Sequence, residues 1–409
     1  MEEAPLRIAF VVLHTSPLDE PGTKDAGGMN VVIRAQAAEL ARLGHVVQIV
    51  TRRSSPELPA EVALVPGLTV HHLDVGPARL LAKGEHEALI TPFGEALATH
   101  LVDHPADLLH AEHWYSGLAA LPVARSTGVP LVQSYHSVAA PESTPLTEGE
   151  RPEAPGRLAG EQLLAREADL VVTVSRAERA TVLGRLGGSD ARVRVVEPGV
   201  DTEVFRPCTD RERVEGSEWI AHGGLPEVLV AGRLHPLKGF DLAIAAVAAV
   251  APERRPSLRI VGAPPPDGDA YVRLLHQAVG DAGMLATTSF DGALHRGVLA
   301  ERLRHATVVL IPSHSETFGL VALEAAASGV PVLARAAGGL REAVLDGETG
   351  LLIDSDDPDV WAAAIDGLLR DHDRIDLLGR SARASALTRT WRASTEALLV
   401  AYREIALPG

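Results

Sequence analysis

Cysteine is almost missing from this sequence, since Cys208 is the only one in 409 residues. One cysteine cannot form an intramolecular disulfide or a cysteine-based metal cluster, and this scarcity is typical of proteins in a reducing compartment. The first residues lack the layout of a signal peptide, and no apolar run is long enough to span a bilayer. We therefore expect a cytoplasmic protein that is not embedded in a membrane.

Positive charge is also scarce. The chain has 38 Lys and Arg against 54 Asp and Glu, which gives a formal net charge of -16 at pH 7. Nucleic acids and anionic membranes are bound through basic surfaces. This balance argues against either of them as the main partner.

Several catalytic signatures are absent as well. The sequence has no GxGxxG dinucleotide loop, no Walker loop, no GxSxG nucleophile elbow and no HExxH metal motif. Its 17 histidines form no arrangement along the chain that predicts a metal site. We therefore expect neither a resident cofactor nor an obligatory metal ion.

What the sequence does have is a repeated α/β pattern. It begins with a strand at Arg7–Leu13, a glycine loop and a helix at Met29–Leu43, and it restarts at Glu227–Arg233 after a turn-rich stretch. A chain of this length with this alternation predicts two α/β domains, each with a doubly wound parallel sheet. The expected division is an N-terminal domain over 1–205, a C-terminal domain over 206–390, and a final helix over 391–409 that packs back on the first domain.

The most informative segment is the one that holds Glu316 and Glu324, directly after a predicted buried strand at Val308–Pro312. In open α/β sheets, ligands bind beyond the carboxyl ends of the strands, where helix N-termini present free N–H groups. The spacing lets one carboxylate serve a ligand from the loop and the other from the first turns of the helix. We predict a small-molecule site here.

Two glycine loops could bind phosphate. The loop Asp25–Asn30 contains a Gly-Gly pair whose backbone could approach a phosphate closely, although an ordinary tight turn explains the same pair. The loop Gly232–Gly239 places Arg233 and Lys238 after a strand, which suits a diphosphate. The alternative interpretation of this loop is a basic segment that is exposed to solvent and binds no ligand.

Other polar residues are weaker candidates when taken alone. His136 follows a predicted strand and lies at the same sheet edge, but a lone histidine is more often a structural residue. Lys83 and Arg157 are in loop contexts and are expected to be solvated. The stretch Pro141–Pro155 is rich in Pro, Glu, Ser and Thr and predicts a surface loop.

Together with the glycine-rich stretch Gly338–Leu351, these segments resemble the retaining glycosyltransferases of family 4 over nearly the whole chain. The resemblance implies an α/β protein of the GT-B fold, with two Rossmann-like doubly wound parallel-sheet domains and an interdomain cleft. Within that family, the opening His14–Val31 is most similar to the enzymes that transfer N-acetylglucosamine from UDP to inositol 3-phosphate in mycothiol biosynthesis.

The resemblance also implies roles on the donor side. Arg233 and Lys238 would bind the diphosphate, Glu316 the sugar hydroxyls and Glu324 the ribose hydroxyls, with His136 beside the transferred sugar. Retention without an obvious nucleophile implies front-face attack, in which the departing phosphate helps to deprotonate the acceptor. The implied catalytic residues are His136, Glu316, Arg233 and Lys238, and the implied donor-binding residues are Gly28, Arg233, Lys238, Glu316, Thr317, Phe318, Gly319, Leu320 and Glu324.

On the acceptor side the sequence departs from the family. The family's phosphate-binding lysine, tyrosine, threonine and arginine match Lys83, His113, Ser137 and Arg157 here, and Asn30 is the fifth implied acceptor residue. Further departures follow the His136 segment, at Ala140–Glu142, and elsewhere in the second half. These are Gly262–Asp267, which replaces a glycine- and serine-containing stretch, and Leu294, which stands where an arginine is expected near the base.

We therefore expect a retaining glycosyltransferase that moves a sugar from a nucleoside-diphosphate sugar to a small polar acceptor with an anionic group. The departures favour specialised-metabolite biosynthesis, of aminoglycoside or lincosamide type. Alternatives are UDP-N-acetylglucosamine transfer to 1D-myo-inositol 3-phosphate, a non-catalytic nucleotide-sugar-binding protein, and a GT-B epimerase or phosphorylase. The expected partners are the nucleotide sugar, the acceptor and a second copy in a homodimer.

Overall fold

A computed structural model describes residues 4–19, 27–209, 224–265 and 268–406. The chain divides into two compact units. Of the described residues, unit 1 holds 4–19, 27–197 and 391–406, and unit 2 holds 198–209, 224–265 and 268–390. The change of unit falls after Glu197, whereas the turn-rich sequence led us to expect it after residue 205.

Unit 1 is built on an eight-stranded sheet in the order β3-β4-β2-β1-β5-β6-β7-β8, which is parallel except for the antiparallel edge pair β3·β4. Its strands are β1 (Arg7–Val12), β2 (Val46–Arg52), β3 (Glu61–Val65), β4 (Leu68–Leu73), β5 (Leu108–Glu112), β6 (Leu131–Ser134), β7 (Leu170–Thr173) and β8 (Val193–Val195). Its helices are α1 (Gly28–Arg42), η1 (Lys83–Leu89), α2 (Ile90–Asp103), α3 (His113–Thr127), η2 (Leu146–Glu148), α4 (Arg157–Glu167), α5 (Arg176–Gly184), η3 (Asp190–Arg192) and α14 (Trp391–Ala406).

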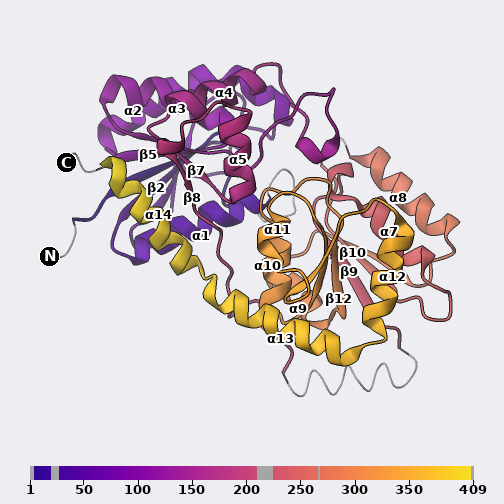
Figure 1. Cartoon of the computed structure of the whole chain (residues 1–409). Helices are drawn as coiled ribbons and strands as arrows, with labels where there is room; N and C mark the ends of the chain where they lie inside the picture. Colours follow the sequence, from indigo (N-terminus) through magenta and orange to yellow (C-terminus); the bar gives the residue numbers. More distant parts are fainter. Residues whose placement is uncertain (1–3, 20–26, 210–223, 266–267, 407–409) are drawn as a thin grey trace. The chain divides into compact units, whose positions relative to one another are not determined.

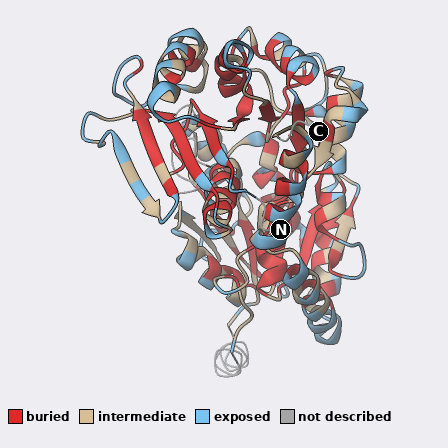
Figure 2. Cartoon of the chain, turned by 90° about the vertical axis from the view of Figure 1, so that its left-hand side faces the viewer, coloured by how far each residue is buried: buried red, intermediate tan, exposed pale blue. Residues whose placement is uncertain are grey.

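Two hydrophobic cores cover the two faces of this sheet. Alternate residues of β1 point to opposite faces, so Ile8 and Phe10 join the core under α1 and α14, while Ala9 and Val11 join the core under α2, α3 and α4 (Figure 1). A strand that is buried on both faces has no polar alternation, which explains the continuous apolar run of β1. Figure 2 shows such strands as buried along most of their length.

Unit 2 contains a six-stranded parallel sheet in the order β11-β10-β9-β12-β13-β14. Its strands are β9 (Glu227–Ala231), β10 (Ser257–Val261), β11 (Thr288–Gly292), β12 (Val308–Ile311), β13 (Val332–Arg335) and β14 (Gly350–Ile353). Its helices are η4 (Pro236–Lys238), α7 (Phe240–Ala249), α8 (Asp269–Asp281), α9 (Arg296–His305), α10 (Leu320–Ala327), α11 (Leu340–Ala343), α12 (Pro358–Leu369) and α13 (His372–Thr388).

Among the parallel strands of each sheet, the strand order reverses once. In unit 1 the reversal lies between β1 and β5, and in unit 2 it lies between β9 and β12. In α/β proteins, ligands bind beside the loops that follow the strands at such a reversal. The prediction of two α/β domains with parallel sheets is confirmed, and no helix in the described part of the chain is both long and apolar enough to cross a membrane.

Candidate functional site

The reversal point of unit 2 brings together the two loops that we singled out in the sequence. Lys238 ends η4 after β9, and Glu316 lies in the loop between β12 and α10. Nζ of Lys238 lies 2.6 Å from Oε2 of Glu316, and both side chains keep partial exposure, 25% and 18%. A cation and a carboxylate thus meet at a solvent-accessible edge of the sheet.

Glycines let these loops come into contact. Gly239 has φ +67°, and a Cβ there would lie 2.3 Å from the carbonyl oxygen of Pro312 at the end of β12. Farther along, a Cβ at Gly338 would lie 2.3 Å from the carbonyl oxygen of Glu316, and one at Gly339 would lie 2.2 Å from that of Thr317. The backbone that carries Glu316 is therefore held between two glycine turns.

Glu324 lies deeper, in α10, and it is 5% exposed. Burial raises the pKa of its carboxyl group, and the nearby charge of Arg296 opposes this rise. Nη1 of Arg296 lies 3.0 Å from Oε1 of Glu324, and the guanidinium also stacks on the ring of Phe205 at 4.7 Å. Arg296 begins α9, two residues after Leu294.

The remaining predicted donor residues of unit 2 lie in the same two loops or at the start of α10. Arg233 is half-buried in the loop after β9, and Phe318 is buried. Gly319, with φ +105°, is the N-cap residue of α10, so Leu320 begins a helix whose first N–H groups lack intrahelical partners. Such a terminus favours negative charge.

In unit 1, the loop after β1 leads into α1 at Gly28, which is exposed at the helix start. The part of the predicted glycine motif over residues 21–26 lies outside the described residues. Asn30 is buried, and its Nδ2 donates to Oγ1 of Thr15 at 3.1 Å and to the carbonyl oxygen of Ser16 at 2.7 Å. Its Oδ1 has no hydrogen-bond partner among the described residues.

His136 and His113 share an unusual backbone. Among the described residues they are the two non-glycine residues with positive φ, 60° and 70°. This left-handed region is strained for a side chain with Cβ, and such strain gathers at functional sites. The two residues follow neighbouring strands, with His113 after β5 and His136 after β6, so the strain lies at one sheet edge.

Glu112 is the partner of His136. Its Oε2 lies 2.5 Å from Nε2 of the imidazole, and it is the last residue of β5. Burial lowers the pKa of His136, but the charge of Glu112 and the hydrogen bond to it outweigh burial and raise it. A second buried carboxyl group, Glu178, also acts on His136, and burial raises the pKa of Glu178 to about 7. The imidazole of His136 therefore lies beside two acidic side chains.

Three of the four residues matched to the family's phosphate site converge on Glu150. Nζ of Lys83 lies 3.2 Å and Nη1 of Arg157 lies 3.4 Å from its carboxylate, and Oγ of Ser137 donates to Oε2 at 3.0 Å. The structure thus brings Lys83, Ser137 and Arg157 together, as the resemblance implied. The carboxylate of Glu150 lies between these three side chains.

Arg157 is not the solvated cation that its loop context suggested. It begins α4, is completely buried, and bonds Glu153 through Nη1 at 2.5 Å and Glu161 through Nε at 2.8 Å. Burial lowers its pKa, but Glu161, Glu150 and Glu153 more than offset burial and raise it. The stretch expected to be a surface loop therefore directs Glu150 and Glu153 inward, because a buried guanidinium requires paired charges.

His113 completes the group together with His14. Both ring nitrogens of His113 and Nδ1 of His14 are buried and have no hydrogen-bond partner among the described residues, and the two ring centroids are 4.4 Å apart. Burial lowers the pKa of both imidazoles well below the ordinary value, with further lowering by Lys83 and Arg157. These two side chains are neutral and can each donate or accept a hydrogen bond.

Sequence reasoning missed several side chains of these groups, namely Glu112, Glu150, Glu178, His14 and Arg296. Glu112 could have been found, because it ends a predicted strand next to the one before His136. Glu150 and Arg296 carry no sequence signal, since each is one of many charged residues in polar segments. Only contacts between distant segments distinguish them.

Comparisons with known proteins show which family the chain matches. A family model described as family 4 glycosyltransferases in conflict systems matches residues 19–398. A protein of Thermomonospora curvata named D-inositol 3-phosphate glycosyltransferase is 41% identical over 411 residues, covering 97% of this chain and 95% of that protein. One of the same name from Kineococcus radiotolerans is 40% identical over 418 residues, with the same coverage of 97% and 95%.

Solved structures show the same architecture. Sucrose-phosphate synthase from Thermosynechococcus elongatus matches with a TM-score of 0.87 at 27% identity, over 98% of this chain and 99% of that one. Anabaena HepE in complex with UDP and glucose matches with a TM-score of 0.75, over 98% of this chain and 100% of that one. The two sequences are 21% identical, so this match supports only a shared fold. These likenesses confirm the GT-B fold expected from the sequence. With a family model over most of its length and relatives about 40% identical throughout, the chain belongs to glycosyltransferase family 4.

Proposed function

We propose that this protein is a retaining glycosyltransferase that moves a sugar from a nucleoside-diphosphate sugar to a small polar acceptor. The observation that carries the proposal is the Lys238–Glu316 pair, 2.6 Å apart at the reversal point of the unit 2 sheet. A cation suits the diphosphate of the donor, and a carboxylate suits the hydroxyls of its sugar. Family membership supports the same class of reaction.

On this proposal, donor binding redistributes the contacts of unit 2. The diphosphate would take Lys238 and Arg233, and Glu316 would then be released to accept hydrogen bonds from the sugar. Glu324 would bind the ribose, while the charge of Arg296 opposes the rise in the pKa of Glu324 that burial causes. Two cations and the N-terminus of α10 would stabilise the charge that develops on the leaving diphosphate, so no metal ion is needed for this task.

His136 is proposed to bind the transferred sugar. The raised pKa that results from Glu112 keeps its imidazole a good hydrogen-bond donor toward a hydroxyl. We propose front-face attack, in which the departing phosphate accepts the proton of the acceptor hydroxyl. Glu112 would act as a positioning residue, since its contact is with the histidine.

The structure changes our expectation about the charge of the acceptor. We expected an anionic group on the acceptor, because Lys83 and Arg157 are cations. Glu150 already stands between these two side chains and Ser137. A phosphate would have to displace this carboxylate, whereas a hydroxyl or amino group could bond to it. We therefore propose an uncharged or amino-bearing polyol as the acceptor, in keeping with specialised-metabolite biosynthesis of aminoglycoside type.

A second candidate is transfer of N-acetylglucosamine from UDP to inositol 3-phosphate. The names of the relatives that are 40% and 41% identical favour it. It requires the Glu150 side chain to move away when the phosphate enters.

The test is release of nucleoside diphosphate that depends on the acceptor. The purified chain would be assayed with UDP-, GDP- and dTDP-sugars against inositol 3-phosphate, inositol and aminocyclitols. We expect turnover with unphosphorylated acceptors, and we expect Glu150→Gln to improve kcat/KM for the phosphorylated one by about 10-fold, or about 1.4 kcal/mol of transition-state binding. Glu148→Gln is the matched control, since this exposed residue lies in the same stretch of the chain.

Other results would lead elsewhere. If wild-type protein used inositol 3-phosphate best, the second candidate would replace the first. Binding of a nucleotide sugar with no release for any acceptor would favour the non-catalytic protein.

A further inference from the structure

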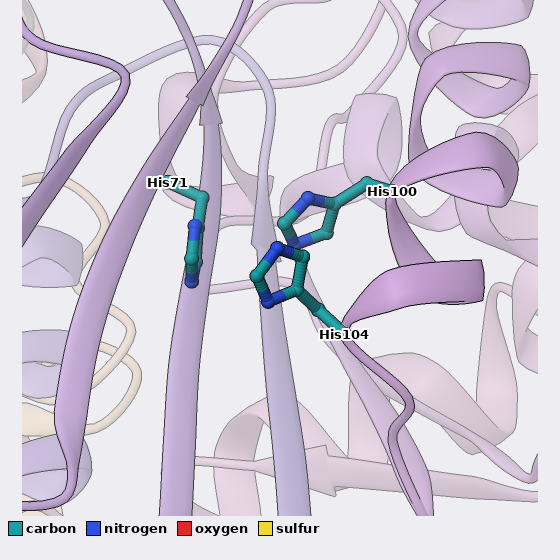
Figure 3. A group of neighbouring side chains, drawn as sticks. All are labelled: His71, His100 and His104. Atoms are coloured by element: carbon teal, nitrogen blue, oxygen red, sulfur yellow. The ribbon is translucent and has the colours of Figure 1, made fainter.

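Three histidines meet on the side of unit 1 where β4 and the end of α2 lie together. His71 lies on β4, while His100 and His104 stand four positions apart at the C-terminal end of α2. One ring nitrogen from each lies within 4.8 Å of those of the other two. Figure 3 shows the three rings gathered around a common space. We propose that His71, His100 and His104 bind a divalent transition metal ion, with zinc as the best fit.

The spacing suits such an ion. Zinc bound by histidine nitrogens at about 2.0 Å in tetrahedral geometry holds its ligand atoms about 3.3 Å apart. The three nitrogens, now within 4.8 Å of one another, would close by about 1.5 Å at most, which small side-chain rotations can supply. Residues four apart on a helix share a face, so His100 and His104 can serve one ion.

The rings are already close to one another. The ring centroids of His100 and His104 are 4.4 Å apart and nearly parallel, and His71 lies 4.7 Å and 4.6 Å from them. Burial, with further lowering from the neighbouring histidines, lowers the pKa of His100 to about 4 and also lowers that of His71. The neutral imidazole is the form that binds metal ions.

Surrounding groups hold the ligands in place. Oε1 of Gln48 on β2 lies 2.8 Å from Nε2 of His100. The Nε2 atom of the same glutamine donates to the carbonyl oxygen of His104 at 2.9 Å. A carboxylate oxygen of Glu61, on the edge strand β3, lies 3.8 Å from Nδ1 of His71. Polar groups of this kind orient metal-bound histidines, and the carboxylate would offset part of the ion's charge.

The ion would join two elements of unit 1, β4 and the C-terminal end of α2. His104 is exposed, so a fourth position on the metal would be open to water. The three protein ligands would tie the C-terminal end of α2 to β4. Because α2 continues directly from η1, which begins at Lys83, the ion would also stabilise the helix that leads from the acceptor residues. This proposal is independent of the sugar-transfer reaction.

The test uses the full chain without a histidine tag, stripped with a chelator and titrated with zinc against a chromophoric chelator. We expect one zinc ion per chain, a rise in melting temperature with zinc, and tetrahedral absorption bands with cobalt(II) in its place. His104→Ala should weaken zinc binding by more than about 100-fold, since it removes a ligand. This loss is larger than the roughly 10–100-fold that is typical when a residue that only contacts a ligand is removed.

The matched control is His372→Ala, an exposed histidine at the start of α13 in unit 2, which should bind zinc like the wild type. His100→Gln provides a second ligand variant in case His104→Ala does not fold, as judged by circular dichroism. The proposal fails if the wild type binds no zinc, or if both ligand variants bind it as tightly as His372→Ala.

Discussion

At the scale of single residues, several buried charges of unit 1 are paired, whereas one buried carboxyl group is only partly so. Arg157 is surrounded by three carboxylates, and His136 is held by Glu112. Glu178 receives one hydrogen bond, from the backbone N–H of Val174 to Oε2, while its Oε1 has no such partner among the described residues. An incompletely paired buried carboxylate costs stability when it ionises.

Glu178→Gln should therefore stabilise the protein at high pH. The folded state holds a proton on Glu178 up to about pH 7, while the unfolded chain releases it near 4.5. Wild-type stability thus falls as pH rises between these values, and the variant escapes that loss. We expect a gain of up to about 3 kcal/mol above neutral pH, at about 1.4 kcal/mol for each unit of pKa shift, and little gain near pH 4.

Urea denaturation at acidic and at alkaline pH would measure this gain. Glu95→Gln, an exposed glutamate on α2, is the control and should change stability little at either pH. An equal effect of Glu178→Gln at both pH values would contradict the explanation.

At the scale of elements, the contact between the loops after β9 and β12 decides where Lys238 and Glu316 meet. Gly239 combines a left-handed backbone with close approach to Pro312. Gly283, just after α8, has nearly the same φ, +66° against +67°, but a Cβ there would have no heavy atom within 4 Å. A comparison of alanine substitutions at Gly239 and Gly283 therefore separates the cost of backbone strain from the cost of the loop contact.

Gly239→Ala should therefore destabilise the protein much more than Gly283→Ala. The left-handed conformation alone costs an alanine about 1–2 kcal/mol, which is the whole effect expected for Gly283→Ala. The clash with the Pro312 carbonyl should raise the cost at Gly239 above about 3 kcal/mol and weaken donor binding. Chemical denaturation compares the two variants, and equal losses would mean that the loops do not need this contact.

At the scale of the whole molecule, the chain makes separate cores in two units. The core of unit 2 contains strands β9, β10, β12 and β13 with α7, α8 and α12, while α14 returns to the core of unit 1 beside β1. Tyr402 of α14 is fully buried there and bonds Nδ1 of His110 at 2.6 Å. The proposed donor residues lie mostly in unit 2, so nucleotide binding should act mainly on that unit.

We expect UDP, or the diphosphate that the enzyme prefers, to slow hydrogen exchange in the unit 2 segments 232–239 and 314–324. Binding to the native state should also raise the melting temperature. Lys238→Ala should weaken the nucleotide by about 10-fold or more, equivalent to about 1.4 kcal/mol, while Arg273→Ala on the exposed face of α8 should not. Protection confined to unit 1 would contradict the donor assignment.

The sequence by itself determined the class of fold and the positions of the loops. Apolar runs such as that of β1 identify strands buried on both faces, and Gly-rich segments after them identify the loops at the sheet edge. Lys238, Glu316 and Glu324 could be named in this way, because periodicity and glycine placement are local properties. The motif resemblance supplied their implied roles, which remain predictions.

The tertiary structure alone decided which charged side chains meet. Glu153 and Glu161 stand four positions from Arg157, but only the fold shows that the guanidinium is buried among them. The contact of Lys83 with Glu150 could not be read from the chain, because 67 positions separate the two residues. His71 reaches His100 and His104 only through the packing of β4 beside α2. Pairing energies of buried charges and metal sites depend on distances between segments far apart in sequence, and folding sets those distances.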